Sequence, residues 1–163
     1  MDLLKKLAGL VIFLIVFYSA KAQKQEPDEH FHDHHSNEIA VASTSVYLLG
    51  EKEFALGLHV HYVYNIPNTK FGLGAGYERI FDDHNHNLLG IIGSYRPIEH
   101  LNLNLSPGLK YQKFSLSTVE FAIHVETSYE FEIKNLHLGP VAGIAISPGD
   151  FHIGLGIHLE IGF

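Results

Sequence analysis

The last thirteen residues of the chain, 151–163, alternate strictly between large apolar side chains and small or polar ones. The large residues are Phe151, Ile153, Leu155, Ile157, Leu159, Ile161 and Phe163. Successive side chains of a strand point to opposite faces, so this segment is a strand with one wholly apolar face. A strand that crosses a membrane needs about 9–11 residues, with apolar side chains toward lipid and polar or tiny ones toward the lumen. The segment therefore predicts a transmembrane β-strand.

Turn signals divide the chain before it into seven more alternating segments, at 38–49, 54–66, 70–81, 88–96, 101–114, 119–133 and 136–146. We expect bulges at Pro107 and Pro140, because proline cannot donate to the ladder. Eight strands joined by short hairpins can close without a free edge, which a bilayer demands. The predicted fold is all-β, an eight-stranded antiparallel up-and-down transmembrane β-barrel.

The sixth segment shows which face points inward. Its apolar residues alternate with Glu120, His124, Glu126, Ser128, Glu130 and Glu132. Four carboxylates cannot lie in a dry hydrocarbon core, where each charge would cost several kcal/mol. We therefore expect this face to line a wet or ion-paired lumen, together with Glu78, Glu160, His59, His61, His137, His152, His158, Lys110 and Arg96.

The aromatic residues give an independent check, because membrane barrels carry an aromatic belt at each interface. One predicted belt is Tyr64, Phe71, Tyr95, Tyr129, Phe131 and Phe163. The other is Tyr47, Phe54, Tyr77, Phe81, Tyr111, Phe121 and Phe151. The alternative all-β fold, a secreted lipocalin-like barrel, needs the large residues inside, where they would overfill so narrow a barrel.

The strand count and the terminal Phe163 resemble the small eight-stranded outer-membrane barrels of the OmpA transmembrane domain and OmpX type, over residues 38–163. The resemblance implies the outer membrane of a Gram-negative-type cell, with outer-membrane lipid as a partner. It also implies recognition of the last strand, ending in Phe163, by the barrel-assembly machinery. It brings no catalytic motif.

The N-terminal part predicts export. Residues 1–22 hold two lysines, an apolar run and a small-x-small site at 20–22, as a signal peptide does. A membrane anchor is the alternative, although the run is shorter than the ~20 residues of a spanning helix. Residues 23–37 are expected to form a disordered, His-rich periplasmic tail, and 38–163 the barrel, with both termini periplasmic. Loss of the signal moves the formal charge from −7 to −9, which argues against nucleic acid as a partner.

Two groups of residues could bind a divalent transition metal such as zinc, copper or nickel, although no cofactor is required. The tail offers His30, His32, His34 and His35, which could also be a plain solvated segment. Counting back from the turns places a second group at one mouth of the lumen, namely Glu132, His137, His158 and Glu160. The lumenal residues could equally do no more than satisfy one another as a structural plug.

Three function classes follow. The first is an outer-membrane barrel with a structural or binding role and no catalysis, and the second is metal binding or handling through the tail and the lumenal His/Glu group. The third, an envelope-lipid enzyme, would need a nucleophile with a base on the lipid-facing wall. Thr127 lies there without a histidine on the same face, so we predict that the protein is not an enzyme.

Overall fold

A computed structural model describes residues 35–112 and 115–163, all as strands and their connections. Within these residues, no helix is long and apolar enough to cross a membrane. The strands are β1 (Asn37–Leu48), β2 (Glu53–Asn65), β3 (Phe71–Phe81), β4 (His86–Ile98), β5 (Leu101–Gln112), β6 (Ser115–Tyr129), β7 (Phe131–Ile133), β8 (Leu136–Ser147) and β9 (Asp150–Gly162).

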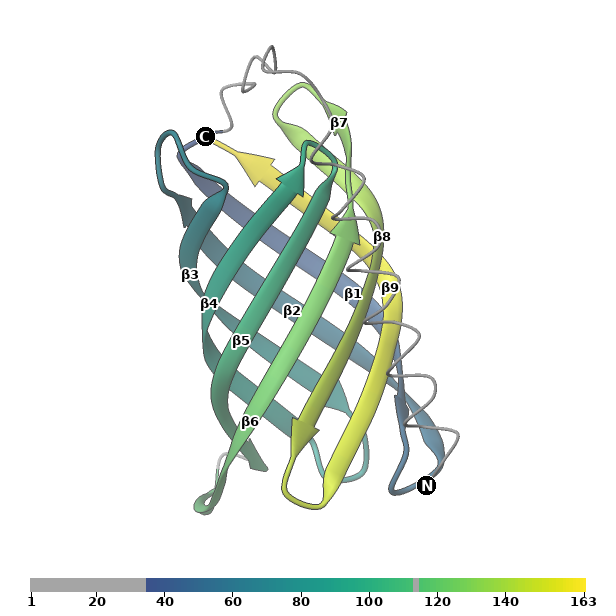
Figure 1. The fold of residues 1–163 in the computed structure, drawn as a ribbon. Helices are drawn as coiled ribbons and strands as arrows, with labels where there is room; N and C mark the ends of the chain where they lie inside the picture. The colour runs from purple at the N-terminus through teal and green to yellow at the C-terminus, as the bar shows by residue number, and fades with distance from the viewer. Residues whose placement is uncertain (1–34, 113–114) are drawn as a thin grey trace, which may run out of the picture. The chain divides into compact units, whose positions relative to one another are not determined.

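The strands form one closed antiparallel barrel (Figure 1). Neighbours in sequence pair from β1 to β6, β9 pairs with both β1 and β8, and β6 pairs with β8 to complete the ring. The beginning of β1 meets the chain end, where Asn37 and Phe163 exchange two backbone hydrogen bonds of 3.1 and 2.9 Å. We call this end of the barrel the terminal end. The distal end carries the hairpins at 49–52, 82–85 and 148–149.

The predicted sixth strand is interrupted at Glu130, so β6 and β7 are two parts of one barrel strand. Both parts keep the same register against β8, with Ser128 opposite Val141 and Phe131 opposite Leu138. The interruption faces Gly139 and Pro140 of β8, and proline has no N–H to complete the ladder. The eight-stranded fold is confirmed, but the prediction of one continuous strand over 119–133 is wrong.

The predicted bulges are also wrong. The register between β5 and β6 is unchanged across Pro107, and that between β8 and β9 is unchanged across Pro140. The irregularities lie nearer the strand ends, between Tyr95 and Ile98 in β4 and between Lys110 and Gln112 in β5. A proline removes one donor without requiring an extra residue, so the ladder tolerates it by leaving one position unbonded.

The large apolar side chains point outward along the strands. Ile157 and Leu155 in the middle of β9 are 62% and 64% exposed, whereas His158 and Glu160 of the same strand are fully buried. The lipocalin-like alternative is therefore excluded, because it needs the opposite arrangement. The aromatic residues of both expected belts are exposed or half-buried, most of them near strand ends, although Phe121 lies in the middle of β6. Phe71 stacks on Tyr95 with ring centroids 5.0 Å apart.

Candidate functional site: the His/Glu cluster of the lumen

The lumen of the barrel is filled mainly by polar and charged side chains, with an apolar cluster of Val46, Leu48 and Ile80 toward the distal end. Among the described residues, the buried charged groups are five carboxylates and two cations, namely Glu38, Glu78, Glu126, Glu130 and Glu160 against Arg96 and Lys110. Seven histidines are buried with them, His59, His61, His86, His124, His137, His152 and His158. Buried charges need partners, so this excess of acid demands protonated imidazoles or bound cations.

Arg96 organises the terminal end of the lumen. Its guanidinium donates two hydrogen bonds to the carboxylate of Glu38, at 2.7 and 2.9 Å, and a third to Oε1 of Glu160 at 2.9 Å. Glu130 Oε2 lies 3.6 Å away. Bidentate arginine–carboxylate pairs fix geometry as well as charge. These lumenal contacts therefore hold β1, β4 and β9 in fixed positions relative to one another.

The predicted neighbours His137, His158 and Glu160 lie together. His137 Nδ1 is 3.1 Å from Oε1 of Glu160, and His158 Nε2 is 4.0 Å from Oε2 of the same carboxylate. Glu132 is opposite His137 in the β7–β8 register, but its side chain is exposed. Glu130, which the sequence also placed on the lumenal face, lies inside instead, 3.6 Å from His137 and 3.7 Å from His158.

A row of imidazoles continues from this group toward the middle of the barrel. The His158 ring stacks on His61 with centroids 5.5 Å apart and planes 18° from parallel, and His59 follows at 4.9 Å. Beyond it His124 lies 5.5 Å from His59. The carboxylate of Glu126 is 3.1 Å from His59 Nδ1.

The small residues of β1 make room for this row. Ala40 is the register partner of both His61 in β2 and Glu160 in β9, and Ala42 is the partner of both His59 and His158. Both alanines are fully buried. With only a methyl group on β1, the longer side chains of β2 and β9 can reach each other across it.

Several ring nitrogens of this row have no hydrogen bond within the described part of the chain. Both nitrogens of His61 and of His158 are in this state, and so is Oε2 of Glu160. Buried polar atoms are paired in the great majority of native structures. An unpaired group of this kind marks a position where a ligand can bind.

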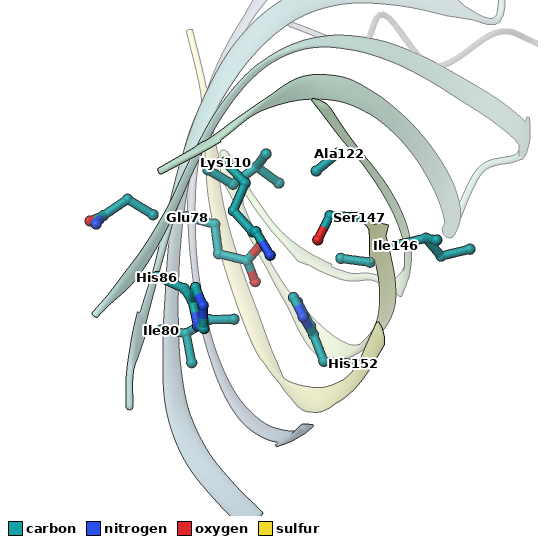
Figure 2. A pocket seen from close by; sticks show the side chains of 11 residues that line it. Glu78, Ile80, His86, Lys110, Ala122, Ile146, Ser147 and His152 are labelled. Carbon is teal, nitrogen blue, oxygen red and sulfur yellow. The ribbon is translucent and has the colours of Figure 1, made fainter. Parts of the chain in front are cut away.

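The distal end of the lumen contains a small pocket (Figure 2). Figure 2 shows Lys110, Glu78 and His152 reaching into it from different strands. Lys110 Nζ is 3.1 Å from Glu120 and 3.4 Å from Asp150. The pocket has an accessible volume of about 10 Å³, enough for one water molecule.

Three of the four predicted tail ligands, His30, His32 and His34, lie outside the described residues. His35 is half-buried at the terminal end, where its carbonyl accepts a 2.8 Å hydrogen bond from Asn65.

Sequence reasoning missed Glu38 as a lumenal residue. It alternates with Ile39, so the period-two pattern of the first strand could have placed it inside. It also missed that His61 approaches His158, since this contact follows from the closing β1–β9 pair. Pairings counted from hairpins do not include that pair.

No protein-family model matches the chain, and no curated protein matches it. Solved structures do match it in fold. A de novo designed transmembrane β-barrel is 15% identical, covers 84% of this chain and 98% of its own, and gives a TM-score of 0.55. Neisserial surface protein A is 13% identical, with coverage of 78% and 96% and a TM-score of 0.54. Ail, the attachment invasion locus protein of Yersinia pestis, was solved with the heparin analogue sucrose octasulfate. It is 11% identical, with coverage of 78% and 99% and a TM-score of 0.54. The chain thus has the architecture of the small eight-stranded outer-membrane barrels.

Proposed function

We propose that the protein is an integral barrel of the outer membrane of a Gram-negative-type cell, with a structural or binding role and no catalysis. The observation that carries the proposal is the division of side chains. Most large apolar residues of the long strands face outward, and the buried carboxylates, cations and histidines face the lumen. Lipid is the solvent that such an exterior fits.

The filled lumen favours binding over conduction. An eight-stranded barrel is just wide enough for side chains to fill it, and the pocket at the distal end has room for about one water molecule. The acid excess favours a cation as the ligand. The polyanion seen with Ail would instead meet a chain whose formal charge after loss of the signal is −9.

The two ends of the sequence would serve export and assembly of the barrel. The signal peptide at 1–22 would direct the chain to the periplasm, and the last strand would engage the barrel-assembly machinery through Phe163. Phe163 is 59% exposed and closes the apolar face of β9. The terminal end of the barrel, with both chain termini, would then lie on the periplasmic side.

Substitutions on the outer wall test the lipid assignment. Ile157→Arg, in the middle of β9, should destabilise the folded barrel by about 2–4 kcal/mol in lipid vesicles, whereas Ile146→Arg at the distal rim should cost about 0–1 kcal/mol. Membrane fractionation and heat-dependent gel mobility report insertion and folding, and planar-bilayer recording reports conduction. A soluble periplasmic chain, equal effects of the two substitutions or a steady conductance would contradict the proposal.

A further inference from the structure

We propose that the lumen holds one divalent transition-metal ion, bound by His61, His158 and Glu160. The inference rests on the proposed function, since it names the ligand of the binding barrel. Nitrogen and oxygen atoms of the three residues lie within 4.8 Å of one another. Two ligands of one zinc ion can be no more than about 4 Å apart, twice the ~2.1 Å bond, so the side chains must rotate to bring the ligand atoms together around the ion.

The ligand atoms of this set are free to bind. Within the described residues, neither nitrogen of His61 or His158 makes a hydrogen bond, and Oε2 of Glu160 makes none. His61 is 2% exposed and the other two are fully buried, so bulk water does not reach them. Unpaired imidazole nitrogens at such depth leave polar groups that a metal ion would satisfy.

Two other His/Glu groups are close enough for a metal but are already engaged. In the set of His59, His61 and Glu126, Nδ1 of His59 is 3.1 Å from Oε2 of Glu126, so one histidine nitrogen is occupied although Oε1 of Glu126 is unbonded. In the set of Glu38, His137 and Glu160, the Glu38 carboxylate is held by both guanidinium nitrogens of Arg96. The set of His61, His158 and Glu160 is therefore favoured, because neither of its histidines makes a hydrogen bond among the described residues.

A supporting shell holds the carboxylate ligand in place. Oε1 of Glu160 accepts a hydrogen bond from Arg96 and lies 3.1 Å from Nδ1 of His137, while Oε2 points toward His158. Groups that orient metal ligands in this way are worth about 10–100-fold in affinity. Oε1 of Glu160 thus holds the side chain in place, and Oε2 is left to bind the metal ion.

The charge around the site also suits a divalent cation. Glu38, Glu130 and Glu160 face the single guanidinium of Arg96, which leaves an excess of two negative charges before any imidazole is protonated. A divalent ion cancels this excess. Two imidazoles and one carboxylate are ligands that suit zinc and copper, with a fourth position open to water or to another group.

The test uses the full chain, purified in detergent, in a background in which His30, His32, His34 and His35 are all replaced by Ser. This removes binding by the tail. Titration calorimetry with zinc should show one site per barrel, and His158→Gln or His61→Gln should raise its Kd by about 100-fold or more. The matched control is His152→Gln, because His152 is also buried with both ring nitrogens unbonded among the described residues, at the other end of the lumen. It should leave the Kd unchanged.

A second measurement needs no change in the lumen. Electron paramagnetic resonance of the copper-loaded background protein should resolve hyperfine coupling to two imidazole nitrogens, and any other number overturns the ligand set. Absence of zinc binding in the background protein also overturns the inference, as does an equal Kd in the His158→Gln and His152→Gln proteins. If the barrel still inserts into the membrane and shows heat-dependent mobility, the proposed function stands without the metal site.

Discussion

Replacing Arg96 by methionine should destabilise the barrel by about 4 kcal/mol at pH 7. The guanidinium is 7% exposed, donates three hydrogen bonds of 2.7–2.9 Å and faces three carboxylates, those of Glu38, Glu130 and Glu160. Methionine keeps a similar length but removes the charge and every donor. The three carboxylates then have no guanidinium to offset their mutual repulsion.

The variant loses least stability if one of the three carboxyl groups takes up a proton, and the cost of that protonation sets the expected loss. A glutamate with an ordinary pKa of about 4.3 needs about 1.4 kcal/mol per pH unit to stay protonated, so one neutralised carboxylate costs about 3.7 kcal/mol at pH 7. Breaking a buried ion pair by removing one partner costs about 3–5 kcal/mol, in agreement. The folded variant then holds a proton that the unfolded chain releases, so its stability falls as the pH rises. The deficit relative to wild type should shrink to about 1 kcal/mol near pH 5.

Urea unfolding from lipid vesicles, followed by gel mobility in the presence of a chelator, measures both values. Arg79→Met is the matched control, because Arg79 is half-buried, its guanidinium lies 4.9 Å from the Phe81 ring and Nη2 donates a 3.2 Å hydrogen bond to Asn85. It should cost less than about 1 kcal/mol. A loss below 1 kcal/mol for Arg96→Met, or one that does not change between pH 5 and pH 8, would refute the role of Arg96 as the central counter-charge.

Three further outcomes are expected. A Cys at Asn85 should be labelled in intact cells and a Cys at Asn68 should not. Both positions have a positive φ, so the backbone strain of the two substitutions is matched. The reverse labelling pattern would contradict the topology. Phe163→Asp should lower the amount of barrel in outer-membrane fractions several-fold, and equal abundance would remove Phe163 as an assembly signal. Gly139→Ala should lower stability by more than about 1 kcal/mol in urea unfolding, because its Cβ would meet the backbone carbonyl of Tyr129 in β6. An unchanged unfolding midpoint would show that the two strands separate easily.

The fold could be predicted because period-two alternation determines which face of every strand meets lipid. The 151–163 segment alone requires a strand with one apolar face, and the observed β9 matches it to within a residue at either end. The interruption at Glu130 could not be predicted from the pattern. It depends on Gly139 and Pro140 of another strand, and the register that brings them opposite Tyr129 and Glu130 is a property of the pair.

The candidate site could be predicted only in part, for the same reason. His137, His158 and Glu160 were placed together because hairpins fix the register of adjacent strands. His61 comes from the other side of β1, and its position relative to His158 depends on how the barrel closes. Closure joins strands that are far apart in sequence, so counting from turns does not reach it.

The seven buried histidines need an explanation beyond folding. A barrel strand that was apolar on both faces would contain long apolar runs, which resemble a spanning helix, so lumenal polar residues help the chain to pass the inner membrane. Serine and asparagine serve that purpose, and Ser94 and Asn102 bond each other in the lumen at 2.8 Å. The buried carboxylates beside the histidines carry an excess of negative charge that such neutral pairs avoid. Packing and export would be served equally well by neutral residues, and the proposed metal site would give the histidine row a function of its own.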